Sequence, residues 1–470
     1  MSTPSSRPNI LLITADDMNW DAVGAFGCPV PETTPNLDQL AADGLRFHHA
    51  HVTIAVCQPS RSALMTGRYP HRSGGEGFYN LRHPGIPILP DLLRRAGYRI
   101  GILGKVGHST PYADFTWDMS HDQVELGMGR NPEQYGQRAG EFMGNACREG
   151  KPFFLMANSH DPHRPFYGND KEEWYTQSPP AVPPSRTFSP DEIAVPGHLH
   201  DLPDIRLELS EYYNSVRRCD DTVGRLLSAL RDSGAEEETI VLFLSDNGMA
   251  FPFAKTNCYL HSTRTPWLAR WPGRISPNSV DRDHFISGVD LLPTLLEATG
   301  IPQPGEIDGS SFLPALLGKP QEDRDHVFTQ FYQTAAKRNY PMRCVQNHRY
   351  GYIFNPWSDG QRIFRNESQA GRTFAAMEEA ADADPTIASR VEHFLHRVPE
   401  ELYDFENDPD GLHNLIDDSA HAAAADDLRS ALEEWMKKME DPALEAFQNR
   451  QSRPALDHLM DKTTLIIGGE

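Results

Sequence analysis

Cysteine is scarce in this 470-residue chain, which contains only six. No two of them form a C-x-x-C pair, and none has the spacing of a zinc site, so the sequence excludes a disulfide-rich scaffold and a zinc-finger-type fold. Isolated cysteines of this kind are typical of free, buried thiols in a reducing compartment.

Long hydrophobic runs are absent as well. No stretch approaches 18 consecutive apolar residues, so we expect no transmembrane helix. The first eight residues, Met1 to Pro8, lack the apolar segment of a secretory signal. The sequence as it stands therefore predicts a cytoplasmic protein, or a periplasmic or secreted one if a signal was removed.

Positive charge is the third shortage, with 44 basic against 66 acidic side chains and a net charge of −22. Such a chain is repelled by the phosphates of nucleic acids and by anionic membranes, so neither is an expected partner. The charge is uneven. Residues 371–470 hold 9 basic and 23 acidic side chains, whereas residues 57–108 hold 8 and 2. The basic segment predicts a focused cationic pocket for a small anion.

Short apolar runs alternate with helical patterns through the first two thirds of the chain. The runs are Asn9–Thr14, Arg99–Leu103, 152–157 and Thr239–Leu244, and the helical patterns are Thr34–Asp43, Ser60–Thr66, Ile88–Ala96 and Leu209–Ser233. Strands of this kind are buried on both faces in parallel sheets. The alternation predicts an α/β fold with a mostly parallel sheet sandwiched by helices.

The pattern changes near residue 324. Residues 326–332, 342–346 and 349–354 are typical of antiparallel strands, and Ala422–Lys438 is typical of an amphipathic helix. At roughly 100–200 residues per domain, the length allows a large domain and a smaller one. We predict a catalytic α/β domain over residues 1–322 and a smaller C-terminal α+β domain with an antiparallel sheet over residues 323–470.

Each predicted parallel strand ends in polar side chains. These are Asp16 and Asp17, then Lys105 and His108, then the segment from Asn158 to His163, and finally Asp246 and Asn247. Any one of them alone could be a helix cap. Because the carboxyl ends of such strands meet at one edge of the sheet, the four together predict a single site.

Four of these residues suit a metal ion. Asp16, Asp17, Asp246 and Asn247 provide three carboxylates and an amide, all of them oxygen donors. Oxygen ligands favour a hard divalent cation, Ca²⁺ or Mg²⁺, over zinc.

The segment Cys57-Gln-Pro-Ser-Arg61, followed by Leu64-Met-Thr-Gly67, resembles the sulfatase signature, which directs oxidation of its cysteine to Cα-formylglycine. The alternative is a buried thiol at Cys57. Residues 7–17, 97–105, 245–248 and 401–409 also resemble type I sulfatases of the alkaline-phosphatase superfamily, so the resemblance covers nearly the whole chain. It implies an alkaline-phosphatase-like fold, and a formylglycine-generating enzyme as the partner in maturation.

Three further segments resemble the heparan N-sulfatases among these enzymes. They are residues 153–164, residues 245–257 and residues 340–346. This resemblance implies a sulfatase that acts on a small sulfated saccharide, with N-sulfoglucosamine favoured. An O-sulfatase acting on another carbohydrate or an aryl sulfate, a phosphonate or phosphodiester hydrolase of the same fold, and a non-catalytic carbohydrate-binding protein remain alternatives. A homodimer also remains open.

The resemblance implies roles for the residues near Cys57. It favours calcium as the cation, with formylglycine 57 completing its ligands, and it makes Lys105 and Lys255 sulfate-binding cations. Arg61 lies one helical turn beyond position 57 and anchors the hydrated aldehyde. The heparan N-sulfatases tend to have arginine where this chain has Lys255.

Two histidines are implied as proton carriers, since imidazole titrates near neutral pH. His163 is the candidate general acid and His108 the candidate partner of the hydrated aldehyde. The family's histidine stands two residues after the lysine, whereas His108 stands three residues after Lys105. We assign four candidate substrate contacts to loops above the strand ends: Arg72, His160, Arg164 and His261.

Overall fold

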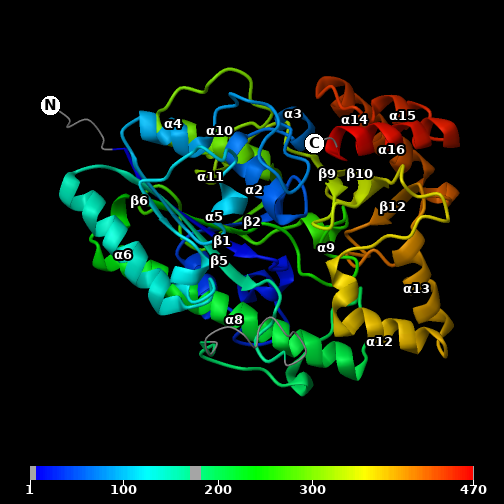
Figure 1. Cartoon of the computed structure of the whole chain (residues 1–470), viewed down its shortest axis with the longest axis horizontal. Helices are drawn as coiled ribbons and strands as arrows, with labels where there is room; N and C mark the ends of the chain where they lie inside the picture. The colour runs from blue at the N-terminus through cyan, green and yellow to red at the C-terminus, as the bar shows by residue number, and fades with distance from the viewer. Residues whose placement is uncertain (1–6, 170–181, 469–470) are drawn as a thin grey trace.

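The computed structural model describes residues 7–169 and 182–468 (Figure 1). Eight strands form one sheet in the order β4-β3-β5-β1-β6-β7-β2-β8, and four form a second sheet in the order β12-β11-β10-β9. The strands of the large sheet are β1 (Asn9–Asp16), β2 (Leu45–His51), β3 (Arg99–Leu103), β4 (Met119–His121), β5 (Phe153–Pro162), β6 (Thr239–Ser245), β7 (Trp267–Arg270) and β8 (Ser279–Ser287).

The large sheet is mostly parallel, as predicted. Only the two pairings made by β7, with β6 and with β2, are antiparallel. The four apolar runs of the sequence are β1, β3, β5 and β6, and these strands are consecutive in the sheet order β3-β5-β1-β6. The carboxyl ends of the four predicted strands therefore lie next to one another.

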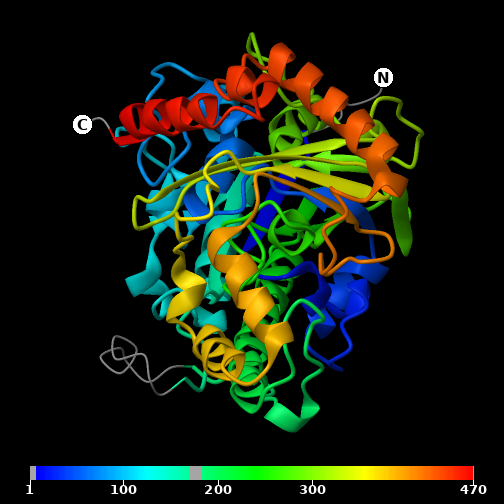
Figure 2. The same cartoon turned by 90° about the vertical axis from the view of Figure 1, so that its right-hand side faces the viewer.

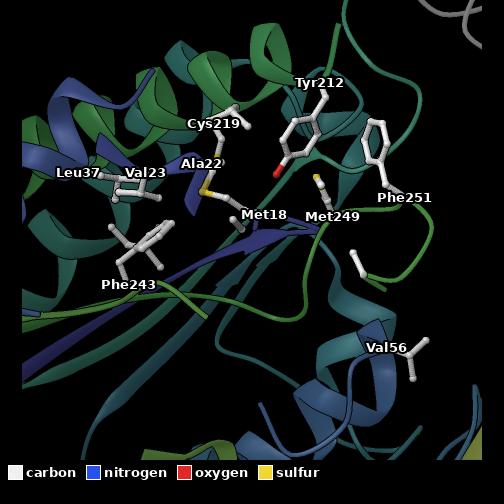
Figure 3. Packing of buried hydrophobic residues seen from close by; sticks show 14 of the residues in the cluster. Met18, Ala22, Val23, Leu37, Val56, Tyr212, Cys219, Phe243, Met249 and Phe251 are labelled. Atoms are coloured by element: carbon white, nitrogen blue, oxygen red, sulfur yellow. The ribbon is translucent and has the colours of Figure 1, made fainter. Parts of the chain in front are cut away.

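Helices cover both faces of this sheet (Figure 1). On one face lie α1 (Pro35–Ala42), α6 (Pro132–Glu149) and α8 (Pro203–Asp232); on the other lie α2 (Cys57–Thr66), α4 (Leu89–Arg95), α10 (Leu291–Thr299) and α11 (Leu313–Leu316). Side chains of β1 alternate between the two cores, with Leu11 and Ile13 in the first and Ile10 and Leu12 in the second. Figure 3 shows part of the first core.

Helix α6 was not predicted from the sequence, because glycine is a poor helix former and recurs in it. Gly136 and Gly140 lie one turn apart on the face toward α8. A Cβ atom at Gly136 would come within 3.1 Å of the Cβ of Arg225, and one at Gly140 within 3.7 Å of the Cβ of Ala229. The glycines therefore allow the two helices to pack closely. Helix α8 also starts earlier than predicted, at Pro203.

The second sheet is antiparallel throughout, as predicted. Its strands are β9 (Val327–Gln333), β10 (Asn339–Gln346), β11 (Tyr350–Phe354) and β12 (Glu400–Asp404). Figure 2 shows α14 (Ala422–Lys438), α15 (Leu444–Gln448) and α16 (Arg453–Gly468) on one face, and α12 (Arg372–Ala381) and α13 (Pro385–His396) on the other. The core under α12 and α13 continues into that of the large sheet. The domain boundary at residues 322 and 323 stays a prediction.

Two expectations concern the whole chain. None of the described helices is long and apolar enough to cross a membrane. All six cysteines are unpaired, and most are buried, but Cys147 is exposed, contrary to the expectation of buried thiols, because it lies on the outer face of α6.

Candidate active site

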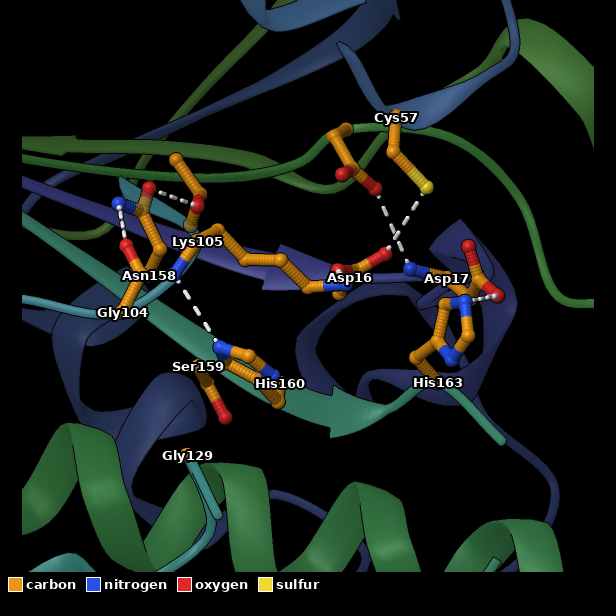
Figure 4. Close-up of polar contacts among 12 residues, drawn as sticks. Asp16, Asp17, Cys57, Gly104, Lys105, Gly129, Asn158, Ser159, His160 and His163 are labelled. Carbon is orange, nitrogen blue, oxygen red and sulfur yellow. Dashed lines mark hydrogen bonds and ion pairs between the residues drawn. The ribbon is translucent and has the colours of Figure 1, made fainter. Parts of the chain in front are cut away.

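The carboxyl edge of the large sheet gathers the polar residues that follow its central strands (Figure 4). Asp16 ends β1, Lys105 follows β3, and His163 follows β5. One ligand atom from each of Asp16, Asp17, Cys57 and His163 lies within 4.8 Å of the others. The structure thus brings the predicted strand ends together with Cys57.

Cys57 is the first residue of α2, a helix whose ten residues are all buried. The positive end of the helix dipole therefore lies at this residue, where it favours negative charge. The Sγ atom donates a hydrogen bond to Oδ1 of Asp16 at 3.3 Å. Burial, together with the negative charge of Asp16, raises the pKa of the thiol well above its usual value. Since the thiolate is the reactive form of cysteine, the unmodified thiol is a poor nucleophile here.

Arg61 is fully buried and ties three elements together. Its Nε and Nη2 atoms lie 2.9 and 2.8 Å from Oδ2 of Asp246, and its Nη1 donates to Thr14 and Asn158 at 2.8 and 2.7 Å. The guanidinium therefore fixes the Asp246 carboxylate relative to β1 and β5. Asn158 was not singled out from the sequence, although it stands in the polar end of β5.

Two lysines supply positive charge to the cluster. Lys105 forms an ion pair with Asp16, and Nζ of Lys255 lies 2.8 Å from Oδ1 of Asp17 and also pairs with Glu367. Burial opposes the charged form, but the neighbouring carboxylates raise the pKa of both lysines above the usual value. Glu367 lies in a short helical turn, Glu367–Ala370, far along the chain, and no local signal in the sequence marks it.

The oxygen-rich set fits a divalent cation. Nδ2 of Asn247 donates to Oδ1 of Asp17 at 2.7 Å, and this leaves Oδ1 of Asn247 buried without a hydrogen-bond partner. Oδ2 of Asp16 faces the ammonium group of Lys105. A buried acceptor without a donor is costly, and a hard cation with oxygen ligands would satisfy the amide oxygen of Asn247.

The carboxylates also repel one another. Burial and the charge of Asp16 raise the pKa of Asp246 to about 6, and burial raises the pKa of Asp17 well above its usual value. At Asp16 burial acts in the same direction, but the positive groups around it, Lys105 first among them, together outweigh burial and lower the pKa. Three carboxylates crowded in this way favour the binding of an additional positive charge.

His163 and His108 both lie at the cluster in neutral form. Nδ1 of His163 donates to the carbonyl of Arg164 at 2.6 Å, so Nε2 faces Asp17, 3.9 Å from its Oδ2. Burial and the charge of Lys105 lower the pKa of His163 to about 3 and that of His108 to about 4. His108 stands in the single turn α5 (Val106–Ser109) with its Nδ1 buried and without a hydrogen bond. The roles of both histidines stay predictions.

Two of the four predicted substrate contacts, His160 and Arg164, bind other residues of the protein near the site. Nε2 of His160 accepts a hydrogen bond from the backbone nitrogen of Lys105 at 3.1 Å. Arg164 is buried, pairs with Glu208 at 2.6 Å and covers the ring of Phe166. In this structure both side chains are engaged by the protein itself.

The other two lie outside the cluster around Cys57. Arg72 pairs with Asp308 at 2.8 Å and with Glu440 at 3.0 Å, and so links α3 (Pro70–Ser73) to the C-terminal unit. His261 contacts Asp410 at 3.0 Å. The structure does not bring Arg72 and His261 together with the cluster.

A cavity of about 440 Å³ opens beside Cys57. Its wall includes Val56, Thr256, Arg338, Arg365, Asn366 and Glu367. Arg338 and Arg365 are exposed and form no ion pair with any carboxylate in the described parts of the chain. Another arginine, Arg343 of β10, is buried against Asp441 at 2.6 Å and does not line the cavity. The cavity can therefore bind an anionic ligand next to the cluster.

Comparison with known proteins agrees with this geometry. Residues 8–301 match the family described as Sulfatase, and residues 250–361 match the one described as N-sulphoglucosamine sulphohydrolase, C-terminal. The chain is 32% identical to human N-sulphoglucosamine sulphohydrolase, over 93% of this chain and 91% of that protein. It is 28% identical to an ulvan-active sulfatase of Formosa agariphila, over 94% and 82% of the two chains.

A solved structure shares the fold at 19% identity, with a TM-score of 0.67 over 93% of this chain and 99% of the other. It is described as a complex with its substrate, D-glucosamine-2-N,6-O-disulfate. The Sulfatase match spans more than half of the chain and contains the whole cluster around Cys57. The protein belongs to the sulfatase family and is a sulfatase.

Proposed function

We propose that this sulfatase removes the N-linked sulfate from a small saccharide that carries N-sulfoglucosamine, using formylglycine at position 57 and a calcium ion. The observation that carries the proposal is the match of residues 250–361 to the C-terminal part of the N-sulphoglucosamine sulphohydrolases. That segment includes Thr256 and Arg338 of the cavity beside Cys57. The similarity therefore extends beyond the shared cluster to this cavity, which we propose as the place of the sugar.

The environment of Cys57 supports its conversion. Its thiol is buried, protonated and next to a carboxylate, so it is unsuited to attack sulfur itself. A hydrated formylglycine supplies an oxygen nucleophile and a second hydroxyl whose deprotonation releases sulfate. Oδ1 of Asp16, 3.3 Å from Sγ, is the acceptor placed to hold a proton of the group at this position.

Asp16, Asp17, Asp246 and Asn247 would hold the cation, which when bound neutralises sulfate and polarises its S–O bonds. The residues of the chain add fixed positive charge. Arg61 holds Asp246 in place, and Lys105 and Lys255 carry ammonium groups into the same buried space. Preorganised charges of this kind stabilise the oxygen charge that develops in the transition state.

Cleavage of an S–N bond leaves a nitrogen that needs a proton. We assign this transfer to Nε2 of His163, since Nδ1 is fixed on the carbonyl of Arg164 and holds the ring toward the cluster. The imidazole is neutral in the free site. The negative charge of a bound sulfate would raise its pKa and allow it to take up the proton that it then donates.

The test uses the whole chain, produced together with a formylglycine-generating enzyme. Mass spectrometry of the Cys57 peptide should show the thiol replaced by an aldehyde. The enzyme should then release sulfate and a free amine from N-sulfoglucosamine, more efficiently than it releases sulfate from 6-O-sulfated glucosamine. Sulfate release from the O-sulfate alone would support the O-sulfatase alternative, and an active enzyme with unmodified Cys57 would contradict the mechanism.

A further inference from the structure

A second cluster of metal-binding side chains lies apart from the residues around Cys57. It consists of His198, which precedes α8, His261 of α9 (Leu260–Thr263), and Asp410, which follows β12. One ligand atom from each lies within 4.8 Å of the others. Oδ1 of Asp410 is 3.0 Å from Nε2 of His261 and 3.6 Å from Nδ1 of His198. One carboxylate oxygen thus faces both imidazoles.

The ring nitrogens of His198 lack hydrogen bonds in this cluster. The side chain is completely buried, Nδ1 stays 3.6 Å from Oδ1 of Asp410, and neither ring nitrogen forms a hydrogen bond within the described parts of the chain. Burying an imidazole with so weak a contact is unfavourable, because it loses its hydrogen bonds to water. A ligand on Nδ1 would remove the part of this penalty that belongs to that nitrogen.

We propose that His198, His261 and Asp410 bind a transition-metal ion of the zinc type, separate from the hard cation expected at Asp16. Two imidazoles and one carboxylate are typical zinc ligands, whereas the Asp16 cluster offers mainly oxygen. Tetrahedral bonds of about 2.0–2.1 Å place neighbouring ligand atoms roughly 3.3 Å apart. The two distances to Asp410, 3.0 and 3.6 Å, lie on either side of that value.

Outer contacts are available to orient His261. A metal on Nε2 leaves the proton on Nδ1, which needs an acceptor. Oδ2 of Asp21 lies 3.7 Å from this atom. Nδ2 of Asn19 lies 3.0 Å from Nδ1 of His261, and Oδ1 of the same amide is buried without a hydrogen-bond partner. Rotation of this amide would turn Oδ1 toward His261 and so offers a second acceptor.

The ion has a route to the site. A cavity of about 410 Å³ reaches His198 and is lined also by His200, Arg390 and His393. It provides access from outside and room for water as the fourth ligand, which a three-residue zinc site requires.

A bound ion would cross-link three distant segments. Asp410 follows the second sheet, whereas His261 lies in α9, whose Ser262 carbonyl accepts a hydrogen bond from the backbone nitrogen of Gly248 at 3.0 Å. Gly248 directly follows Asn247 of the active site. We therefore expect the ion to stabilise the contact between the two sheets rather than to take part in sulfate transfer.

Cobalt is the probe, because tetrahedral Co²⁺ gives intense visible bands. The experiment uses the full-length Cys57→Ala variant, which lacks the active-site thiol, in excess Ca²⁺, which occupies the oxygen cluster. We expect one equivalent of Co²⁺ to give these bands. The bands should be lost when His198→Gln or Asp410→Asn is introduced into the Cys57→Ala protein. His200→Gln, at a histidine of the same cavity, is the matched control and should keep them.

Zinc should also raise the unfolding temperature of the Cys57→Ala protein by a few degrees, and not that of its Asp410→Asn derivative, because an ion that binds only the folded state stabilises it. Asp410 is partly exposed, so this variant is expected to fold even if His198→Gln does not. Absence of the cobalt bands, or bands that survive Asp410→Asn, would overturn the proposal and leave a hydrogen-bonded His–Asp–His group.

Discussion

Buried charge is arranged differently at Arg343 than at Cys57. Arg343 meets one carboxylate, Asp441, through two contacts of 2.6 and 2.9 Å, and its remaining nitrogen donates to a backbone carbonyl. Around Cys57, three carboxylates share one buried space with Arg61 and two lysines. The first group is a matched pair of one cation and one carboxylate joined by hydrogen bonds, whereas the second crowds several charges together and leaves Oδ1 of Asn247 without a donor.

The pKa values follow this difference. Burial opposes ionisation of Asp441, but the charge of Arg343 and the hydrogen bonds from Arg343 and Ala443 together outweigh it and lower the pKa, so folding favours the charged form. At Asp246 burial and a like charge raise the pKa to about 6. The backbone differs too, since Asp17 and Lys105 adopt positive φ angles of 68° and 48°, which are unfavourable for side chains of this kind. We therefore expect the Arg343 pair to matter for stability and the Cys57 cluster to matter for catalysis.

The largest effect that this comparison predicts is a loss of sulfatase activity at Cys57 with little change in the stability of the fold. Replacing Cys57 with alanine removes the nucleophile and should lower the rate of sulfate release by more than about 10⁴-fold. The unfolding temperature should change by only a few degrees, since no ion pair is broken. Activity assays on N-sulfoglucosamine and thermal unfolding monitored by circular dichroism test both. Substantial residual activity would place the nucleophile elsewhere.

The opposite result is expected at the matched pair. Arg343→Met leaves Asp441 buried and unpaired, which should cost about 3–5 kcal/mol of unfolding free energy in urea titrations. The kcat of the remaining folded enzyme should stay within about twofold, because Arg343 does not line the cavity. The double variant Arg343→Met/Asp441→Leu is the control and should recover much of the loss. A change in kcat without a change in stability would break the distinction between the two regions.

The sequence was sufficient to predict the strands that carry this chemistry. Residues 9–14 and 239–244 are continuous apolar runs with polar residues directly after them, so both the buried strands and the edge at which they end could be predicted. The same reasoning placed Asp16 and Asp246 together, because parallel strands bring their carboxyl ends to one edge.

The remaining parts depend on contacts between distant segments. Glu367 reaches Lys255 from a turn between strands β11 and β12 of the second sheet, and Arg365 reaches the cavity from the same connection. No local pattern marks such residues. His261 was predicted as a substrate contact from its loop position, and the structure places it against Asp410, which only the packing of the second sheet on the first could reveal.

A smaller effect concerns the pH dependence of a second matched pair. Glu401 is buried with Arg397, 2.6 Å away. Burial opposes ionisation of Glu401, but the charge of Arg397, together with hydrogen bonds from His393 and Tyr403, lowers its pKa well below the usual value. The stabilisation is therefore present above the unfolded-state pKa of about 4.3 and is lost as the pH falls from there toward the folded-state pKa.

Glu401→Gln should accordingly cost about 2–3 kcal/mol of unfolding free energy at pH 7. The difference from the unsubstituted protein should shrink as the pH is lowered below about 4. Urea unfolding at a series of pH values measures it. A difference that is constant with pH would mean that the pair acts through packing rather than through charge.

The smallest predicted effect concerns the arginines of the cavity beside Cys57. Arg338 and Arg365 are exposed cations without a carboxylate partner in the described structure, unlike Arg343, and so they remain available to a second anionic group of the substrate. Because exposed charge pairs contribute only about 0.2–1 kcal/mol, each change to glutamine should raise KM for glucosamine-2-N,6-O-disulfate by roughly two- to fivefold and leave kcat unchanged.

The matched control is Lys337→Gln, which removes the same charge from the neighbouring position outside the cavity wall. The increase in KM should weaken at high salt, which screens exposed charges, and should be smaller for N-sulfoglucosamine, which lacks the second sulfate. An equal increase with both substrates would place the arginines on the transferred sulfate itself. They would then belong with Lys105 and Lys255 in the cluster kept for chemistry, and the division between sugar recognition and sulfate binding would have to be drawn elsewhere.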